Sequence, residues 1–281
     1  SHDFPLGLTG CAIRAIVAAN YSHGNADRQI AMKHVYATVS AIDRYGPWVW
    51  ITIYETEITH QLAPGRFVMA DLDGLPRYPI FPARVTPDTF DVLVQSDHPA
   101  ACLDEGASLD LIGPMGRGFR YDESDRRWLL IASNRFLSPA LGLLQQASDA
   151  DVSTALLLTA PTATELYPIR WLPPSVEVHV STFDGSGGFP SSSLDLFRRL
   201  VGWADRVFVV TDRHQHISLA QQVTQARIAP SHDFAQALVV PTMICAAGFC
   251  QGCAVSVADG VKLACTDGPV FDLLELASIA R

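Results

Sequence analysis

Four of the six cysteines in this chain of 281 residues lie within its last 37 residues. They are Cys245, Cys250, Cys253 and Cys265, and the first three are separated by four and then by two residues. Thiolate sulfur binds iron and zinc, and cysteines crowded in this way favour a metal centre over a disulfide framework. The tail therefore predicts a metal site in a reducing compartment, which we take to be the cytoplasm.

The spacing of these cysteines indicates which metal centre to expect. A C-x4-C-x2-C run followed by a distant fourth cysteine is the plant-type [2Fe–2S] pattern. Gly248 and Gly252 let the loop curl so that backbone N–H groups can approach the sulfurs. A structural zinc site is the alternative, although zinc sites usually place their cysteines in two separate close pairs. We therefore expect a [2Fe–2S] cluster that moves electrons, with a zinc-stabilised binding module as the alternative.

Composition excludes several other classes of protein. The net charge of −9 would repel nucleic acid, and the arginines do not gather into a basic stripe. No run approaches the roughly 18 apolar residues of a membrane helix, so we expect no membrane span. Hydrophobic residues make up 48% and charged residues 17% of the chain, which suits large buried surfaces or a protein partner. The length favours two domains plus a small appendage.

Two patterns of hydrophobicity divide the chain before the tail. Residues 1–30 form an N-terminal extension without a core of its own. Residues 31–124 contain β-branched and aromatic runs between Pro and Gly turns, which predict an antiparallel β-barrel. Its expected strands are 35–42, 48–54, 66–71, 90–95 and 108–112.

From residue 125 to residue 240, strand patterns alternate with helix patterns, which predicts a parallel, doubly wound sheet. A helix should begin with Ser138 as its N-cap and Pro139 at its first position. Residues 241–281 form the metal-binding subdomain, so the fold class is α+β with several domains. The strands expected here are 128–132, 155–159, 176–181, 206–211 and 235–240, and the other helices are 193–204 and 217–227.

Several segments between residues 33 and 276 resemble the electron-transfer subunit of class B dihydroorotate dehydrogenases. The most specific is the ending Cys265-Thr-Asp-Gly-Pro-Val-Phe-Asp272, and the others are Pro64–Val68, Gly113–Phe119 and Asp184–Gly188. The resemblance implies a ferredoxin reductase-like architecture with FAD between the barrel and the sheet. It also implies electron transfer to or from a partner redox protein or catalytic subunit, within a hetero-oligomer.

The resemblance also suggests flavin contacts. The family's Arg-x-Pro-aliphatic-Ser loop corresponds to Arg77-Tyr-Pro-Ile-Phe81, so Arg77, Pro79 and Ile80 are the expected FAD-binding residues, while Phe81 stands where the family has a hydroxyl. The segment that holds the FAD diphosphate corresponds to Ser96–Leu103, which has neither glycine nor threonine. Two hypotheses follow: an electron-transfer subunit with FAD, or a non-catalytic cluster-bearing adaptor without it.

The nucleotide loops of the parallel sheet also depart from the family. Ala132–Pro139 replaces a glycine-rich turn, and Thr211–His214 replaces a Cys-Gly-Pro segment, so we do not expect NAD(P) binding. His214 and His216 form the most site-like pair of histidines, although buried or solvated structural histidines are more common. The sequence contains no hydrolase or kinase motif.

Overall fold

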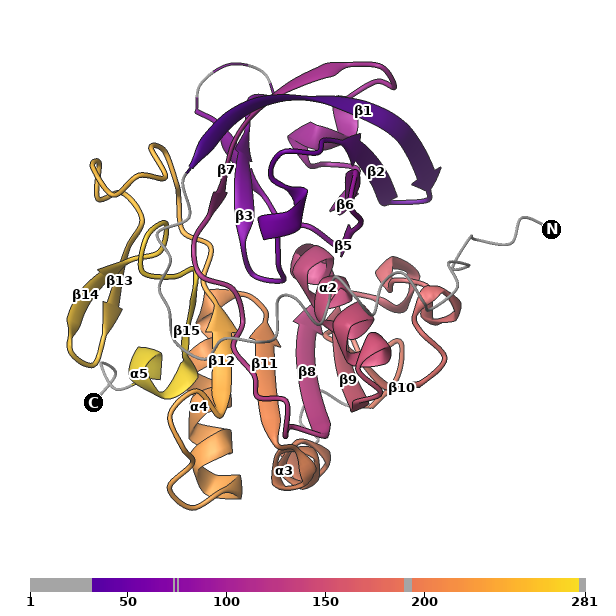
Figure 1. Cartoon of the computed structure of the whole chain (residues 1–281). Coiled ribbons are helices and arrows are strands. Elements are labelled where there is room, and N and C mark those ends of the chain that lie inside the picture. The colour runs from indigo at the N-terminus through magenta and orange to yellow at the C-terminus, as the bar shows by residue number, and fades with distance from the viewer. Residues whose placement is uncertain (1–31, 73, 75, 190–193, 278–281) are drawn as a thin grey trace.

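The computed structural model describes residues 32–72, 74, 76–189 and 194–277, and the predicted N-terminal extension lies outside them. The first part is a curled antiparallel sheet of seven strands, drawn in indigo to magenta in Figure 1, in the order β4-β3-β7-β1-β2-β6-β5. Two short 3-10 helices, η1 (Thr59–Gln61) and η2 (Pro99–Cys102), lie between its strands. The strands are β1 (Lys33–Tyr45), β2 (Trp48–Tyr54), β3 (Phe67–Ala70), β4 (Tyr78–Ile80), β5 (Arg84–Val85), β6 (Thr89–Gln95) and β7 (Ser108–Met115).

Alternation of buried and exposed residues in β1 gives this curled sheet an apolar inner face. In β1, Val35, Ala37 and Val39 are buried inside the curl, whereas the residues between them are exposed. Leu109 and Leu111 of β7 meet them from the neighbouring strand. A period of two puts one apolar face inside the curled sheet of seven strands, which therefore has its own core. We call this sheet the half-barrel.

The second part is a sheet of six strands in the order β10-β9-β8-β11-β12-β15, in which all strands except β15 run parallel. The chain then ends in the hairpin β13–β14, strand β15 and a short helix, which lie together at one side in Figure 1. None of the described helices is long and apolar enough to cross a membrane. The elements are β8 (Arg127–Ser133), η3 (Asn134–Phe136), α2 (Leu137–Asp149), β9 (Ser153–Ala160), η4 (Ala163–Glu165), η5 (Ile169–Trp171), β10 (Val176–Thr182), α3 (Leu194–Trp203), β11 (Arg206–Val210), α4 (Arg213–Ala226), β12 (Ala235–Leu238), β13 (Ala254–Val257), β14 (Gly260–Leu263), β15 (Val270–Asp272) and α5 (Leu273–Ala277).

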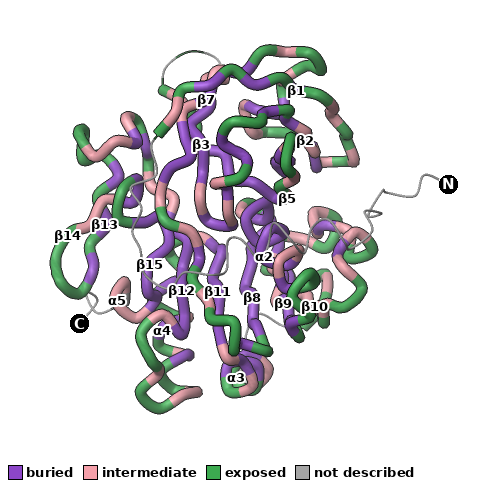
Figure 2. The backbone as a smooth tube through the Cα atoms, viewed as in Figure 1, coloured by how far each residue is buried: buried purple, intermediate pink, exposed green. Residues whose placement is uncertain are grey.

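Strands β8, β11 and β12 are buried on both faces, as the purple tube of Figure 2 shows. In β8, Leu129 and Ile131 face α3 and α4. Trp128 and Leu130 face the other way, toward α2 and the half-barrel. Helices on the two faces are what a doubly wound sheet requires, and the predicted fold class is confirmed.

Three local predictions need correction. Helix α2 begins at Leu137 and has Phe136 at its N-cap, so Ser138 does not cap it. Helix α4 begins at Arg213, four residues before the predicted start at residue 217. The tail also supplies β15, which pairs antiparallel with β12 at the edge of the parallel sheet and had no counterpart in the sequence prediction.

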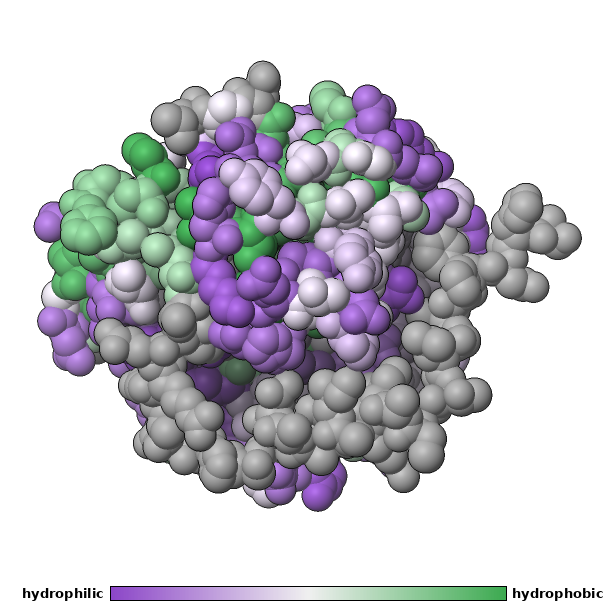
Figure 3. All heavy atoms as spheres, turned by 45° about the horizontal axis from the view of Figure 1, so that its top comes forward, coloured by the Kyte–Doolittle hydropathy of each residue, from purple (hydrophilic) through white to green (hydrophobic). Residues whose placement is uncertain are grey.

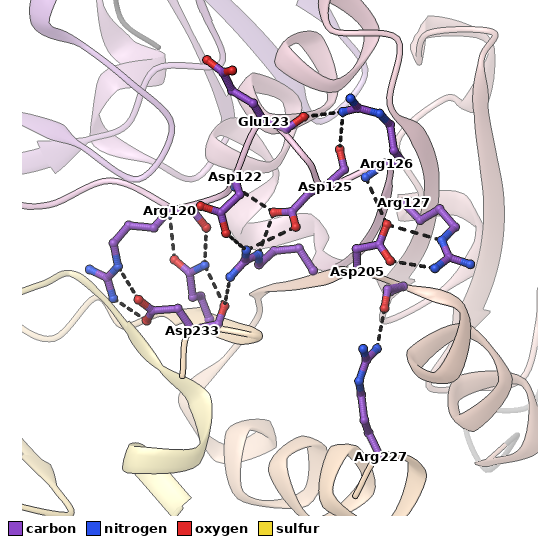
Figure 4. Close-up of polar contacts among 12 residues, drawn as sticks. Arg120, Asp122, Glu123, Asp125, Arg126, Arg127, Asp205, Arg227 and Asp233 are labelled. Carbon is purple, nitrogen blue, oxygen red and sulfur yellow. Dashed lines mark hydrogen bonds and ion pairs between the residues drawn. The ribbon is translucent and has the colours of Figure 1, made fainter. Parts of the chain in front are cut away.

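Residues 116–126, between β7 and β8, connect the two sheets, and we call them the linker. A polar network holds this linker, as Figure 4 shows. Arg206 of β11 is buried and donates from Nε to Asp125 Oδ2 at 2.9 Å and from Nη2 to Asp122 Oδ2 at 2.7 Å. Nearer the half-barrel, Arg120 makes two hydrogen bonds to the Asp233 carboxylate, at 2.7 and 2.6 Å. The linker is therefore fixed against the parallel sheet along its length.

Candidate iron–sulfur site

Three of the four tail cysteines lie on the loop between β12 and β13, and the fourth follows β14. The hairpin brings Cys253 and Cys265 together, because Cys253 directly precedes β13 and the Ala264 N–H donates to the Cys253 carbonyl at 3.0 Å. Their Sγ atoms are 3.1 Å apart. This distance exceeds the roughly 2.05 Å of a disulfide, and it is within the ~4.6 Å that two metal–sulfur bonds of about 2.3 Å can span.

The loop before β13 turns its backbone N–H groups toward sulfur. Gly248 has a φ of 80°, and Ala246 and Gln251 adopt left-handed conformations with φ of 48° and 55°. The Cys250 N–H points at Cys245 Sγ, with a separation of 3.4 Å. Hydrogen bonds from the backbone N–H groups of Cys250 and Ala247 lower the pKa of the Cys245 thiol to about 7. The loop thus favours a thiolate at Cys245, which is the form that binds metal.

The four sulfurs differ in their exposure to solvent. Cys253 and Cys265 are buried, Cys245 is half-buried, and Cys250 is exposed. Burial, followed by the contact with Cys253, raises the pKa of the Cys265 thiol to about 12, whereas a backbone N–H from Gly248 acts in the opposite direction. Two sulfurs of low solvent access without a cation nearby are costly as thiolates, and a bound metal would supply that positive charge.

These observations fit an iron–sulfur cluster. All four ligand atoms are sulfur, they come from one loop and one hairpin, and N–H groups already approach two of them. A Cβ added at Gly252 would lie 3.6 Å from Cys250 Sγ, so the backbone passes close to the sulfurs. The assignment of Cys245, Cys250, Cys253 and Cys265 as ligands of the cluster stays a prediction.

The segments of the tail, the linker and the half-barrel that carry the family resemblance contact one another. The Arg117 N–H donates to the Gly268 carbonyl at 2.5 Å, and the Phe119 N–H donates to the Pro64 carbonyl at 3.0 Å. Gly116 has a φ of 72°, and a Cβ there would lie 2.5 Å from Pro269 Cδ. The tail is therefore held by main-chain contacts to the rest of the body.

The predicted flavin-contact residues Arg77, Pro79 and Ile80 lie at β4 and differ in burial. Arg77 Nη1 donates to the Asp110 carboxylate at 2.9 Å and to the Asp110 carbonyl at 3.0 Å, and hydrogen bonding to that carboxylate raises the pKa of Arg77. Ile80 is buried in the core of the half-barrel. Pro79 is half-buried opposite Met69 on β3.

The two histidines singled out in the sequence have different environments. His216 is buried, its Nε2 donates to the Thr211 carbonyl at 3.2 Å, and burial lowers its pKa to about 4. His214 lines a cavity of about 340 Å³ between the parallel sheet, α3 and α4. His216 is thus a neutral structural histidine that fixes the start of α4.

A second group of possible metal ligands is already satisfied by protein donors. Potential ligand atoms of His232, Asp233 and Asp272 lie within 4.8 Å of one another. However, both Asp233 oxygens accept from Arg120, and the Asp272 oxygens accept from the N–H groups of Asp233 and Leu274. The guanidinium beside them disfavours a second cation, so this group is a hydrogen-bonding network.

Three large apolar side chains of the tail are exposed to solvent. Phe249 is 88% exposed, Val261 is 68% exposed and Ile244 is 54% exposed. In Figure 3, apolar side chains gather on the side of the molecule where the tail lies. We call these three residues the tail patch, and exposed apolar side chains of this size are common at protein interfaces.

Comparisons with known proteins agree with this arrangement. The family model described as the iron–sulfur cluster binding domain of dihydroorotate dehydrogenase B matches residues 241–277. The chain is 30% identical over 220 residues to a probable dihydroorotate dehydrogenase B (NAD(+)) electron transfer subunit of Thermoplasma acidophilum, covering 77% of this chain and 81% of that one. A subunit of the same name from Shouchella clausii is 23% identical over 235 residues, covering 78% and 88%.

Solved structures show the same fold. An NADH-dependent reduced ferredoxin-NADP oxidoreductase aligns with a TM-score of 0.73 at 20% identity, covering 85% of this chain and 88% of that one. The ferredoxin reductase of carbazole 1,9a-dioxygenase aligns with a TM-score of 0.60 at 16% identity, covering 73% and 69%.

A half-barrel, a doubly wound sheet and a cysteine tail on one body define an iron–sulfur protein with the ferredoxin reductase-like fold. The tail is an iron–sulfur cluster binding domain. The chain belongs to the family of dihydroorotate dehydrogenase B electron transfer subunits, as its sequence resemblance predicts.

Proposed function

We propose that this chain is the electron-transfer component of an oxidoreductase and relays single electrons through a [2Fe–2S] cluster held by Cys245, Cys250, Cys253 and Cys265. The observation that carries the proposal is the convergence of the Cys253 and Cys265 sulfurs beside a loop whose N–H groups point at Cys245. When bound, such a cluster supplies reversible one-electron chemistry at a potential tuned by hydrogen bonds and solvent access. The working unit is the proposed subdomain 241–281, mounted on the proposed domains 31–124 and 125–240.

The burial of the four cysteines makes one side of the site more accessible to a partner protein than the other. Cys253 and Cys265 lie toward the core, whereas Cys250 faces solvent beside the tail patch. An electron can therefore enter or leave on the Cys245 and Cys250 side, where a docked protein could approach closely. The N–H groups aimed at Cys245 stabilise negative charge on its sulfur, which favours the reduced state.

The partner that we propose is a catalytic redox subunit that docks on the tail patch. The relatives are named as subunits of dihydroorotate dehydrogenase B, so a dihydroorotate-oxidising subunit is the first candidate. Ile244 and Phe249 of the patch adjoin Cys245 and Cys250 in the chain, which is where a permanent subunit contact would serve electron transfer. The complex would then be a hetero-oligomer.

Metal analysis of the anaerobically purified protein tests the cluster. We expect about two irons and two acid-labile sulfides per chain, visible absorption that bleaches on reduction, and a rhombic electron paramagnetic resonance signal after one-electron reduction. Cys250→Ser should remove most of the iron and the absorption. Cys102→Ser is the matched control, because Cys102 is also exposed but belongs to η2 in the half-barrel. Zinc without sulfide would show a structural zinc site and end the electron-transfer proposal.

Replacement of Phe249 by serine tests the docking surface. Since the Phe249 side chain is solvent-exposed in the single chain, the variant should keep its iron content and absorption. Its complex with the catalytic subunit, co-expressed and measured by size-exclusion chromatography, should dissociate at higher protein concentration than the wild-type complex. Ile228→Ser is the control, because Ile228 is 97% exposed and follows α4, outside the tail. Equal affinities of the two variants would place the interface elsewhere.

A further inference from the structure

The surface of the half-barrel that faces the parallel sheet is packed with this chain's own side chains. Phe81 follows β4 and is only 8% exposed, and its ring centroid lies 5.5 Å from that of Phe67 on β3. Both rings belong to one buried cluster that also contains Leu137 and Leu141 of α2 and Leu158 of β9. At this place the two sheets share a continuous apolar core.

Helix α2 packs directly on the half-barrel. The Ser138 hydroxyl donates to the Phe81 carbonyl at 2.7 Å and accepts from the Leu93 N–H at 3.0 Å. A Cβ added at Gly142 would lie 3.2 Å from Pro64 Cγ and 3.3 Å from the Pro82 carbonyl oxygen. A planar ring bound between two surfaces needs a van der Waals contact distance on each of its faces. At Gly142 even one added methyl group would lie closer to the half-barrel than ordinary van der Waals contact.

The segment after β6 uses its N–H groups internally. His98 Nδ1 accepts from the Ala100 N–H at 3.1 Å, and the Ala101 N–H donates to the His98 carbonyl at 2.8 Å. Pro99 has no N–H, and the Leu103 N–H donates to the Ala100 carbonyl at 3.2 Å. A diphosphate is held by free N–H groups or cations, and the N–H groups of Ala100, Ala101 and Leu103 are already bonded within this turn.

Aromatic side chains close the same end of the half-barrel. Trp48 pairs with Gln95, the last residue of β6, and its ring meets Tyr167 edge-on with centroids 5.3 Å apart. Trp171 lies 5.6 Å from Tyr167 and 5.0 Å from Tyr45. The connection between β9 and β10 is thereby attached to the half-barrel, with Tyr167 only 1% exposed.

The only arginine of the Arg77–Phe81 loop is also committed. The Arg77 guanidinium donates to the Asp110 side chain and carbonyl, and His34 Nε2 lies 2.7 Å from the same carboxylate. Releasing Arg77 to a phosphate would leave the Asp110 carboxylate without its strongest partner.

We propose that the interface between the two sheets is a closed protein core and that this chain binds no flavin. Phe81 and the internally bonded turn at residues 98–103 occupy the positions where the resemblance suggested a flavin and its diphosphate, and Ser138 of α2 bonds to the Phe81 carbonyl. The flavin content does not depend on the proposed function. The consequence for electron flow does rest on it: a cluster without a flavin passes one electron at a time, so two-electron oxidation of any substrate takes place in the partner.

Flavin content and flavin binding test the proposal on the full chain purified anaerobically. We expect no flavin in the supernatant after acid denaturation of a sample whose iron and sulfide are measured in parallel. Titration with FAD, followed by flavin fluorescence and by the thermal unfolding midpoint, should show no saturable quenching and no shift. One flavin per chain, or saturable binding with a raised midpoint, would overturn the proposal. Absence of iron and sulfide would contradict only the proposed function.

Phe81→Ala tests whether the ring is part of a packed core. Loss of a buried phenyl group should lower the unfolding midpoint by several degrees, and FAD should not restore it. Val85→Ala on the neighbouring strand β5 is the control, because Val85 is 37% exposed and its truncation should leave the midpoint nearly unchanged. If Phe81→Ala has no larger effect than Val85→Ala, the ring does not fill the interface and the proposal fails.

Discussion

Replacing Arg206 by methionine tests how strongly the linker is bound to the parallel sheet. The side chains of Arg206 and Asp125 are only 10% and 8% exposed, and Arg206 also donates to Asp122 and to the Asp233 carbonyl. Methionine fills much of the volume but leaves the Asp125 carboxylate buried without its cation. Breaking a buried ion pair in this way costs about 3–5 kcal/mol. At ~2–4 °C per kcal/mol for chains of 150–250 residues, the unfolding midpoint should fall by roughly 6–20 °C.

An ion pair at the start of β8 provides a matched control. Arg127 and Asp205 form an ion pair at 2.7 Å, but their side chains are 46% and 27% exposed. An exposed pair contributes about 0–1 kcal/mol, so Arg127→Met should lower the midpoint by only a few degrees. Thermal unfolding followed by circular dichroism, at one pH and one iron content, measures both variants.

A second variant separates lost attraction from an unpaired charge. The double replacement Arg206→Met with Asp125→Leu removes the buried carboxylate as well, and it should recover a large part of the lost stability. Equal midpoints for Arg206→Met and Arg127→Met would refute the reasoning. So would a double variant that is less stable than Arg206→Met alone.

Two further predictions concern backbone space and pH. Gly116→Ala should destabilise the protein by more than about 1 kcal/mol and speed iron loss on incubation with a chelator. The cause is twofold, because φ is 72° and the new Cβ would lie 2.5 Å from Pro269 Cδ. Gly74→Ala is the control that separates backbone strain from steric collision, because φ is 86° there but no atom lies near the new Cβ. For His216, the folded pKa of about 4 lies below the unfolded 6.5, so the unfolded state binds more protons and stability falls as pH drops from about 6.5 to 4, by up to ~3 kcal/mol. His216→Gln should flatten the dependence of urea unfolding on pH in that window, and an unchanged slope would contradict the assignment.

Local patterns predicted the antiparallel sheet, because its longer strands are β-branched and aromatic runs and its turns contain Pro and Gly. In β1 and β2, the apolar runs at residues 35–42 and 48–54 required only neighbouring residues to be recognised. The cysteine tail was equally visible, since a metal site needs particular residue types at particular spacings. The short edge strands β4 and β5 were missed, because three and two residues carry too little periodicity.

Long-range partners explain what could not be predicted. Ser138 has the sequence context of an N-cap, but its hydroxyl bonds to Phe81 and Leu93, which lie 57 and 45 residues away. Arg206 resembles an ordinary charged residue at a strand end, and only the linker aspartates 81 and 84 residues before it make burial possible. No local rule contains those contacts, so the N-cap prediction for Ser138 was wrong and Arg206 was not singled out.

The contacts of the tail explain how the half-barrel can serve an electron carrier when its interface with the parallel sheet is closed. Gly116, Arg117 and Phe119 belong to a segment that resembles the family, and they pack against Pro64 and Gly268 rather than against an open cleft. Val239 adds an N–H bond to the Pro269 carbonyl at 2.9 Å, so the turn after Cys265 is held by both sheets. Cluster sulfurs must keep fixed positions relative to the N–H groups beside them, so movement of the backbone that carries them would disturb the site. The half-barrel therefore acts as a rigid mount for the tail, and this role requires direct packing between the sheets, which a flavin in the interface would replace.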